Sequence, residues 1–356
     1  MLPLAVQGAM HRLSESYEFS GTETKGANGF VFFGTARVTG VQVAIKFYYW
    51  GNQPELHAEP RILAQCSSEN VVGIQVAELV GDGWAMFVTP RLAGDLEETI
   101  NRGALSLHGA LDAARDVYAG LCALHGNGIV HRDLKPANIL ISSHARAVIG
   151  DFGSVATISS ESLDSVASKH SILYRPPESF EGDRYTRLGD LYQVGVILHE
   201  MLAGPLSTLP VDWIQPKNQQ IYHALATDFE QSQFVDQELS RRIRAGTLLR
   251  TPALPFCVPR RVRLFIKKQA GIDPNARARS AADAMSELLS LRRASLDWFM
   301  EGSEAIGYGN GVTVRVESVG SGVQVHVNRG SGLRRDRSLE GASPSVSCEL
   351  ANARFA

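Results

Sequence analysis

Residues 131–153 combine side chains whose types and spacing could carry out phosphoryl transfer. Asp133 and Asn138 lie in the string His-Arg-Asp-Leu-Lys-Pro-Ala-Asn, and Asp151 begins an Asp-Phe-Gly string 18 residues after Asp133. One carboxylate could orient an acceptor hydroxyl, while an amide and a second carboxylate could hold Mg²⁺ on a triphosphate. Each short string arises by chance in unrelated proteins, but both in this order are a strong indication of this chemistry.

A turn and a strand near the start of the chain could bring backbone amides and a cation to the same triphosphate. Residues 17–50 alternate between apolar and polar types with turn residues at intervals, which predicts a hairpin followed by a third strand. The first turn contains Gly26 and Gly29, where the backbone could approach phosphate oxygens without a Cβ in the way. A Val-Ala-Ile-Lys string then ends in Lys46, and a lysine on the buried face of a strand is unusual without a partner.

Together these strings resemble the motifs of the eukaryotic-type (Hanks-type) serine/threonine protein kinases. The resemblance reaches to about residue 290, or about four-fifths of the chain, although Thr24 stands where the family has the first glycine of its turn. It implies that Lys46 pairs the α- and β-phosphates and that Val31 and Ala44 enclose the adenine. The residues that it assigns to the nucleotide are Gly26, Gly29, Val31, Ala44, Lys46, Thr89, Arg91, Leu92 and Asp95.

The resemblance also implies a glutamate that pairs with this lysine from the next helix. Glu59, in Glu-Pro-Arg-Ile-Leu, has the expected order of an acid followed by aliphatic residues, and Glu55 is the alternative. The gap from Lys46 to Glu59 is shorter than is usual in the family, which predicts a short helix. Pro60 has no N–H, so we expect it to kink this helix or to confine it to a first turn.

Residues 71–80 and 84–89 are predicted to be strands that lead into the connection between two lobes. By resemblance, Thr89 is the gatekeeper behind the adenine, and backbone groups from Pro90 to Leu92 bond the edge of the base. Pro90 can offer only its carbonyl group, because proline has no N–H. Asp95 is expected to lie near the ribose.

The resemblance assigns the chemistry itself to six side chains. Asp133 orients the substrate hydroxyl and accepts its proton late in the transfer, and Lys135, typical of the serine/threonine type of loop, steadies the γ-phosphate. Asn138 and Asp151 coordinate Mg²⁺ between the phosphates of ATP. The catalytic set is therefore Asp133, Lys135, Lys46, Glu59, Asn138 and Asp151, with Asn138 and Asp151 as the metal ligands.

Arg132 lies beside the catalytic acid, and in kinases with this arginine a phosphate on the activation loop often binds it. The loop over residues 154–171 offers the acceptors Thr157, Ser159, Ser160, Ser162, Ser165 and Ser168. A Ser-rich loop that is ordered without any phosphate is the alternative. Ser171 is expected to contact Asp133 and Lys135.

Three further residues are expected to support the scaffold. By resemblance, Glu178 forms a buried ion pair with Arg277, and Asp190 holds the backbone of the His-Arg-Asp string. Breaking such a buried pair by removing one partner would cost about 3–5 kcal/mol.

We therefore expect an α+β protein with the bilobal protein-kinase fold: an antiparallel five-stranded N-lobe with one helix, a mainly helical C-lobe and a C-terminal β-hairpin extension. The expected parts are an N-terminal segment (1–15), the nucleotide-binding N-lobe (16–92), the C-lobe with the catalytic and activation loops (93–290) and the extension (291–356). Alternating valines predict the hairpin at about 311–328, and the Gly-, Ser- and Arg-rich remainder is expected to be disordered. The hairpin could be decorative or a docking element.

The composition argues against binding to nucleic acid or membranes. A net charge of −2, with 20% charged and 44% hydrophobic residues, is typical of a globular protein with a sizeable core. No apolar run reaches the roughly 18 residues of a membrane span, and the first residues lack the basic region of a secretory signal. Four scattered cysteines predict reduced thiols rather than zinc ligands or disulfides. We expect a cytoplasmic protein.

The expected function is transfer of the γ-phosphoryl group of Mg-ATP to serine or threonine hydroxyls of protein substrates, together with autophosphorylation. One alternative is a pseudokinase that acts as an ATP-binding or protein-binding scaffold, whose usual mark is a missing lysine or acid. A second is a small-molecule kinase of similar fold, such as an aminoglycoside phosphotransferase, which generally lacks the segment around Glu178 and the Lys135 pattern.

Overall fold

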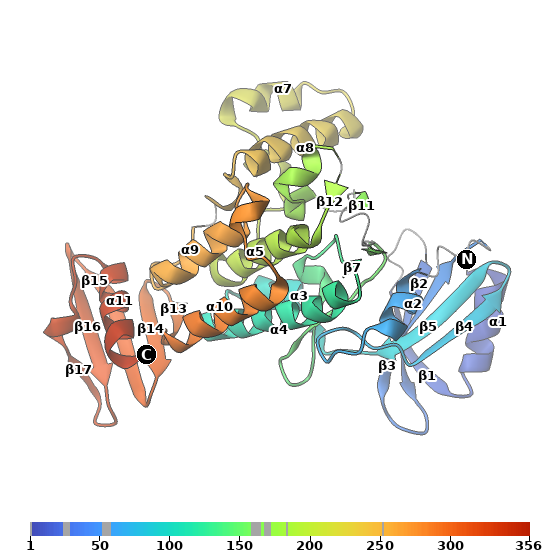
Figure 1. Ribbon diagram of the computed structural model, residues 1–356, viewed down its shortest axis with the longest axis horizontal. Coiled ribbons are helices and arrows are strands. Elements are labelled where there is room, and N and C mark those ends of the chain that lie inside the picture. Colours follow the sequence, from blue (N-terminus) through green and yellow to red (C-terminus); the bar gives the residue numbers. More distant parts are fainter. Residues whose placement is uncertain are drawn as a thin grey trace.

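The computed structural model describes residues 2–23, 29–51, 58–157, 165–166, 172–182, 184–250 and 253–356. The chain forms an N-terminal lobe built on a sheet, a helical middle lobe and a C-terminal sheet with one helix (Figure 1). The two sheets lie at opposite ends of the long axis, and the helical lobe lies between them. The expected bilobal kinase architecture is confirmed, with a larger C-terminal part than expected.

The N-lobe sheet has five antiparallel strands, as expected, and their order is β1-β2-β3-β5-β4. Alternate residues of these strands point to opposite faces, and the side chains on one face form an apolar cluster. Phe32, Ile45 and Val88 are examples from three neighbouring strands. The bounds are β1 (Tyr17–Glu23), β2 (Gly29–Ala36), β3 (Gln42–Tyr49), β4 (Val76–Gly81) and β5 (Trp84–Pro90).

Two helices pack on this lobe, one more than the sequence predicts. Helix α1 (Leu4–Leu13) buries Val6 and Ala9 in the apolar cluster of the outer face of the sheet. Helix α2 (Ala58–Gln65) belongs to the other face, where its Ile62 and Leu63 join the main core with Phe87. Apolar side chains therefore pack against both faces of the sheet.

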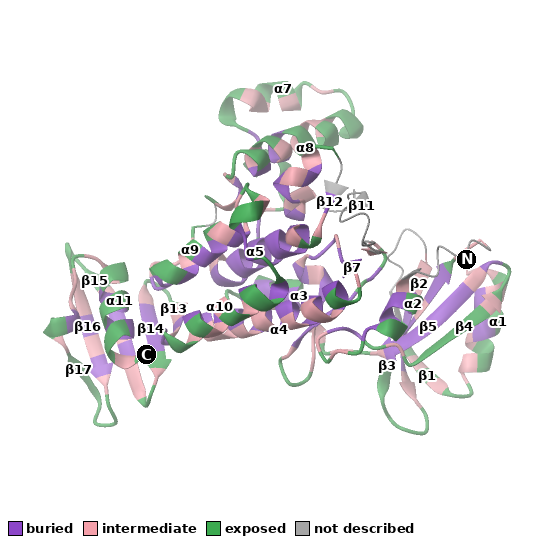
Figure 2. Cartoon of the chain, viewed as in Figure 1, coloured by how far each residue is buried: buried purple, intermediate pink, exposed green. Residues whose placement is uncertain are grey.

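The C-lobe is organised around one buried helix, α5 (Arg187–Ala203), whose residues are buried from Gly189 to Leu202 (Figure 2). Helix α4 (Leu107–Gly126) packs on α5, and the Ser106 side chain caps its first turn by accepting from the Gly109 amide. The other helices are α3 (Leu96–Arg102), α6 (Pro210–Trp213), α7 (Gln219–His223), α8 (Asp228–Arg244), α9 (Arg260–Gln269) and α10 (Ala281–Arg293). Within the described ranges, no helix is long and apolar enough to cross a membrane.

Short strands hold the loops between these helices. Strand β6 (Gly94–Asp95) pairs with β8 (Ile139–Ile141), which pairs with β9 (Ala147–Ile149). The two-residue strands β7 (Ile129–Val130) and β10 (Ala156–Thr157) form a second pair, and β11 (Ser165–Val166) and β12 (Arg184–Tyr185) a third. The segments that carry Asp133, Asn138 and Asp151 are therefore fixed at both ends.

The C-terminal extension contains the predicted hairpin, but the prediction of a disordered tail is wrong. Strands β15 (Val312–Val319) and β16 (Gly322–Asn328) form this hairpin, inside a five-stranded antiparallel sheet. The other strands are β13 (Asp297–Glu301), β14 (Glu304–Gly309) and β17 (Leu333–Arg335), and helix α11 (Pro344–Phe355) follows. The tail is ordered because Leu339, Cys348 and Ala351 supply a small apolar face that is buried with the valines of the sheet.

The extension packs on the C-lobe. The Asp297 side chain accepts a hydrogen bond from the His108 amide (2.7 Å) at the start of α4, and the Arg260 amide donates to Glu349 (2.6 Å). Strand β13 lies against α4, and the apolar residues of both parts form one cluster. All four cysteines, Cys66, Cys122, Cys257 and Cys348, are free thiols.

Candidate active site

Lys46 reaches the space between the lobes because of its register in β3. Its neighbours Ile45 and Phe47 are fully buried on the outer face of the sheet, so Lys46 points to the opposite face. Its cross-strand partners are Val31 in β2 and Phe87 in β5. Ala44 shares this face, opposite Thr89, so four residues predicted to line the nucleotide site lie on one surface.

The Lys46 ammonium group joins two acids from different elements. Its Nζ donates to both carboxylate oxygens of Glu59 at 2.9 Å and lies 3.5 Å from Oδ1 of Asp151. Burial alone would lower the pKa of Lys46, but the two carboxylates outweigh it and raise the pKa. The lysine is therefore charged at neutral pH and links β3, α2 and the Asp-Phe-Gly string.

The partner glutamate comes from a short helix, as its sequence predicts. Glu59 lies in the first turn of α2, and Pro60 follows it in the same turn, where its missing N–H has no carbonyl to bond. The helix continues to Gln65, so Pro60 neither kinks it nor confines it to one turn. Glu55, the alternative partner, lies outside the described residues.

One buried acid fixes the backbone on which the catalytic loop is built. Asp190 is fully buried at the start of α5, and its carboxylate accepts hydrogen bonds from the amides of His131 (3.0 Å) and Arg132 (2.9 Å). The side chains of His125 (2.7 Å) and Tyr185 (3.0 Å) bond the same carboxylate. Burial would raise the pKa of Asp190, but these hydrogen bonds outweigh it and lower the pKa, so the acid stays ionised.

The candidate acid Asp133 sits in a compact polar group with two other predicted residues. Lys135 Nζ lies 3.1 Å from Asp133 Oδ2, and the Asn138 amide donates to the Asp133 carbonyl (2.7 Å) and to Oδ2 (3.3 Å). With its NH₂ group engaged in this way, Asn138 keeps its amide oxygen for another partner, and an oxygen is the kind of ligand that Mg²⁺ prefers. The three residues that the sequence places in one loop therefore form one contact group.

Asp151 and Phe152 connect the catalytic loop to the N-lobe. The Phe152 ring is buried and packs edge-on against His131 with ring centroids 5.2 Å apart, while its amide donates to Glu59 (3.3 Å). Burial would raise the pKa of Asp151, but Lys46 outweighs it and lowers the pKa. The half-exposed Asp151 carboxylate is thus an ionised oxygen donor that faces Lys46.

Two non-glycine residues of the site have a left-handed backbone. The φ angles are +70° for Arg132 and +51° for Asp151. Such conformations cost about 1–3 kcal/mol each and persist only where the surroundings enforce them. Here Asp190 holds the Arg132 amide and Lys46 faces the Asp151 side chain, so the strain is held at the two positions that set the catalytic geometry.

Gly26, Gly29 and Leu92, which the sequence assigns to the nucleotide, have different outcomes in the structure. Gly26, like Thr24, lies outside the described residues. Gly29 pairs with Tyr48, and a Cβ there would collide with the Phe47 carbonyl, so glycine is needed for strand packing whatever else it does. The amide of Leu92 makes no hydrogen bond within the described part of the chain, which leaves it a donor for a ligand.

Arg91 and Asp95 each make contacts within the chain that the sequence did not single out. The Arg91 amide donates to the Gln42 carbonyl (2.9 Å), so among the backbone groups from Pro90 to Leu92 it is the one already bonded within the chain. The Arg91 guanidinium instead stacks on Phe33, 4.3 Å from the ring centroid. Asp95 caps α3 by accepting from the Glu98 amide (2.8 Å), so one of its oxygens is already bonded.

The activation segment is described at its two ends and at residues 165–166. Arg132 donates from Nη2 to the Val155 carbonyl (3.3 Å), so backbone carbonyl groups take up part of its hydrogen-bonding capacity. The backbone at Thr157 and Ser165 is described, but Ser159, Ser160, Ser162, Ser168 and Ser171 lie outside the described residues. The proposed phosphorylation of this loop therefore stays a prediction.

Two polar pairs anchor the end of this segment. Arg277 donates to both oxygens of Glu178 at 2.7 Å, as the resemblance implies. The sequence did not single out the second pair, in which the Tyr174 hydroxyl donates to Glu200 of α5 (2.8 Å). The available signal was the acid Glu200 in the mainly apolar run of residues 191–202, because a buried acid needs a partner.

The amino-acid sequence matches the model of a known protein family. The model of the protein kinase domain matches residues 18–289 of the chain. This range covers nearly all of the N-lobe sheet and of the helical lobe, and it ends before the C-terminal sheet.

Individual relatives match over shorter stretches. The chain is 34% identical over 190 residues to mitogen-activated protein kinase 12 of Danio rerio, which covers 50% of this chain and 52% of that protein. It is 33% identical over 149 residues to probable serine/threonine-protein kinase PknB of Lactococcus lactis (40% and 23%). It is 32% identical over 215 residues to serine/threonine-protein kinase pkn2 of Myxococcus xanthus (56% and 25%). The matches thus cover about half the length of the first relative and about a quarter of the other two.

Proposed function

The chain belongs to the protein kinase domain family, and on that basis we propose that it transfers the γ-phosphoryl group of ATP to serine or threonine hydroxyls of protein substrates. The observation that carries this proposal is the joining of Lys46, Glu59 and Asp151 across the two lobes, together with the contact group of Asp133, Lys135 and Asn138. A site that had lost turnover would be expected to lack one of these groups. All of them are present and in contact.

We assign the nucleotide to the face of the sheet that carries Val31, Ala44 and Lys46. The Lys46 ammonium, oriented by Glu59, would bind the α- and β-phosphates as a fixed positive charge. The Pro90 carbonyl and the Leu92 amide remain for the edge of the base, while the Arg91 amide does not. Thr89 is almost buried beside them, which suits a residue that limits the depth of the site.

We assign the metal to Asn138 and Asp151, whose free oxygens fit a hard divalent cation such as Mg²⁺. When bound, the cation would neutralise charge on the phosphate oxygens. A divalent ion also suits the charge of the site, where Lys46 already balances Glu59 and leaves Asp151 with spare negative charge.

The chemical step is proposed as an in-line displacement without a covalent enzyme intermediate. The acceptor hydroxyl oxygen bonds the γ-phosphorus as the bond from that phosphorus to the bridging oxygen breaks, and ADP leaves. Asp133 holds the hydroxyl and takes its proton late, and Lys135, 3.1 Å from Asp133, stabilises charge on the moving phosphoryl group. Lys135 is also the feature that favours serine and threonine over tyrosine as acceptors.

A phosphotransfer assay on the full chain tests this proposal. Purified protein is incubated with Mg²⁺ and radiolabelled ATP, alone and with peptides that carry serine, threonine or tyrosine. We expect label on serine and threonine, loss of transfer on chelation, and rates lower by about 100-fold or more for Lys46→Ala and Asp151→Ala. Lys217→Ala, which changes an exposed lysine of the C-lobe, is the matched control and should retain the wild-type rate. An Asp151→Ala protein with wild-type autophosphorylation would contradict the metal assignment.

A further inference from the structure

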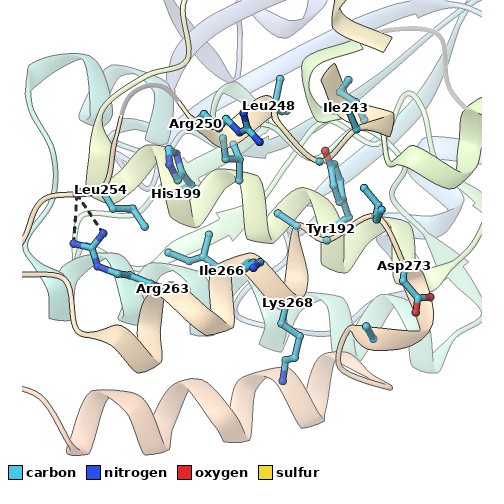
Figure 3. A pocket seen from close by; sticks show the side chains of 18 residues that line it. Tyr192, His199, Ile243, Leu248, Arg250, Leu254, Arg263, Ile266, Lys268 and Asp273 are labelled. Atoms are coloured by element: carbon cyan, nitrogen blue, oxygen red, sulfur yellow. Dashed lines mark hydrogen bonds between the residues drawn. The ribbon is translucent and has the colours of Figure 1, made fainter. Parts of the chain in front are cut away.

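A cavity of about 560 Å³ lies in the C-lobe, apart from the candidate active site (Figure 3). Its walls are α5, α9, residues 243–250 at the end of α8 and after it, and the turn after α9. None of the residues assigned to the nucleotide, the metal or the phosphoryl transfer lines it. We refer to it as the C-lobe cavity.

Most of the wall of the C-lobe cavity is apolar. Its larger apolar residues include Ile243, Leu248, Leu249, Leu254 and Ile266. The Tyr192 ring forms part of the wall from α5, and the Arg277 guanidinium lies 5.1 Å from the centroid of the same ring. A volume of this size with preformed, mainly apolar walls is typical of sites for small molecules.

One buried polar side chain in this wall has no partner for one of its atoms. His199 is 2% exposed, projects from α5 into the C-lobe cavity, and its Nδ1 makes no hydrogen bond within the described part of the chain (Figure 3). Buried polar atoms are nearly always bonded, so an unbonded one at a cavity wall points to a ligand group. Burial lowers the pKa of His199 to about 4, so at neutral pH the ring is uncharged and offers one donor and one acceptor.

The charged residues of the wall are mostly cations. Arg250 and Lys267 are exposed at its edge and make no ion pair with any described residue. Arg263 donates to the Val258 and Leu254 carbonyls (2.9 and 3.4 Å) and forms no ion pair with a described residue, although Glu349 lies near enough to act on its charge. Lys268 pairs with Glu287, and Asp273 is the single acid among the residues that line the cavity. The edge therefore has an excess of positive charge.

We propose that the C-lobe cavity binds a small amphipathic organic anion. The apolar or aromatic body of the ligand packs among Leu248, Leu249 and Ile266, a hydrogen-bonding group meets His199, and a carboxylate or sulfonate lies at the edge beside Arg250 and Lys267. This inference is independent of the proposed kinase activity, because the two sites share no residue.

The first test uses 8-anilinonaphthalene-1-sulfonate, an aromatic sulfonate whose fluorescence rises on binding. The full chain is first saturated with Mg²⁺ and a non-hydrolysable ATP analogue, so that the nucleotide site is blocked. We expect one saturable site per chain. Ala270→Leu places a larger side chain in the wall and should weaken binding about 10-fold or more, as expected when part of an apolar site is filled. Ala282→Leu, at an exposed position of α10, is the matched control and should bind as the wild type does.

The second test separates the parts of the ligand. Decanoate, an aliphatic carboxylate, should displace the probe, while N-phenyl-1-naphthylamine, which has the same ring system without the sulfonate, should bind about 10-fold more weakly. His199→Leu removes the hydrogen-bonding group at similar volume and should also weaken binding of the probe several-fold. If Ala270→Leu does not fold, the result for His199→Leu alone shows whether the probe binds in the C-lobe cavity. The proposal is overturned if no saturable site exists, if folded Ala270→Leu and His199→Leu proteins both bind as the wild type does, or if the uncharged probe binds equally well.

Discussion

Substitution of Glu200 by Gln should make the protein more resistant to unfolding as the pH rises. Glu200 is 3% exposed on α5 and accepts hydrogen bonds from the Tyr174 hydroxyl (2.8 Å) and the Leu206 amide (2.9 Å). The pKa of Glu200 is raised from 4.5 to about 7, mainly by burial. The two hydrogen bonds lower the pKa by less than burial raises it, and the charge of Glu97 adds a smaller increase. At 1.36 kcal/mol per pKa unit, keeping this group ionised in the folded state costs about 3 kcal/mol.

The direction follows from proton binding. Between about pH 4.5 and 7 the folded protein keeps a proton on Glu200 that the unfolded chain has already released. Glu200 therefore makes the free energy of unfolding fall as the pH rises through this window, with no further change above it. Glutamine does not titrate, so Glu200→Gln removes this fall. It also loses one hydrogen bond, since it has one acceptor oxygen, and that loss lowers stability by about 1 kcal/mol at every pH.

Because the pKa of the neighbouring His199 is also shifted, the unfolding free energy of Glu200→Gln must be compared with that of the wild type at each pH. Burial lowers the pKa of His199 from 6.5 to about 4, so the unfolded chain binds a proton that the folded protein lacks, and stability rises with pH over that window. The contributions of Glu200 and His199 thus oppose each other in the wild type. The contribution of His199 cancels when Glu200→Gln is compared with the wild type at each pH.

The assay is urea unfolding of both proteins at pH values from 4.5 to 8, followed by intrinsic fluorescence. The unfolding free energy of Glu200→Gln minus that of the wild type should increase by about 3 kcal/mol across this range. Glu301→Gln, at an exposed position of β13, should give a difference near zero at every pH. A Glu200→Gln difference that stays constant within about 1 kcal/mol would refute the reasoning from burial.

Three other substitutions test the scaffold. Arg277→Met leaves Glu178, which is 21% exposed, without its partner and should lower the unfolding free energy by about 3 kcal/mol in urea titrations; an unchanged value would argue against the pair. Asp190→Asn removes the charge that holds two catalytic-loop amides. It should lower the unfolding free energy by about 2–4 kcal/mol in urea titrations and slow phosphoryl transfer in the labelled-ATP assay. Asn352→Leu leaves the Leu296 and Trp298 N–H groups buried without an acceptor and should lower the melting temperature while nucleotide affinity stays the same.

The residues of the active site could be predicted from the sequence because their chemistry requires fixed types at nearly fixed spacing. Lys46, Glu59 and Asp151 come together in the structure, as do Asp133, Lys135 and Asn138. Their catalytic roles stay predictions until activity is measured. The helix with Glu59 is short, as expected, because the chain between the lysine and the glutamate is short.

Polar pairs between distant helices could not be predicted in the same way. The contact between Tyr174 and Glu200 joins residues 26 positions apart, and a single sequence gives no spacing rule for such a pair. The hydrogen bond from the Arg91 amide to the Gln42 carbonyl likewise joins residues far apart in the sequence.

The two ends of the chain show the limit of composition as evidence. The region after residue 328 is rich in Gly, Ser and Arg and reads as disordered, yet α11 folds because a few apolar residues meet the valine face of the sheet. At the other end, α1 folds on the N-lobe sheet by burying Val6 and Ala9. In both cases tertiary packing supplies the stability that a short isolated helix lacks.

The central claim is that Asp133 acts on the acceptor hydroxyl of a nucleotide held mainly by other residues. The most direct test is to measure Mg-ATP affinity and phosphoryl transfer for the wild type and Asp133→Asn under the same conditions. We expect the wild type to phosphorylate serine or threonine, and Asp133→Asn to bind Mg-ATP with an affinity within about threefold of the wild type but to transfer the phosphoryl group at least about 100-fold more slowly. Transfer by Asp133→Asn at the wild-type rate, or a wild type that neither binds Mg-ATP nor phosphorylates any protein, would contradict it.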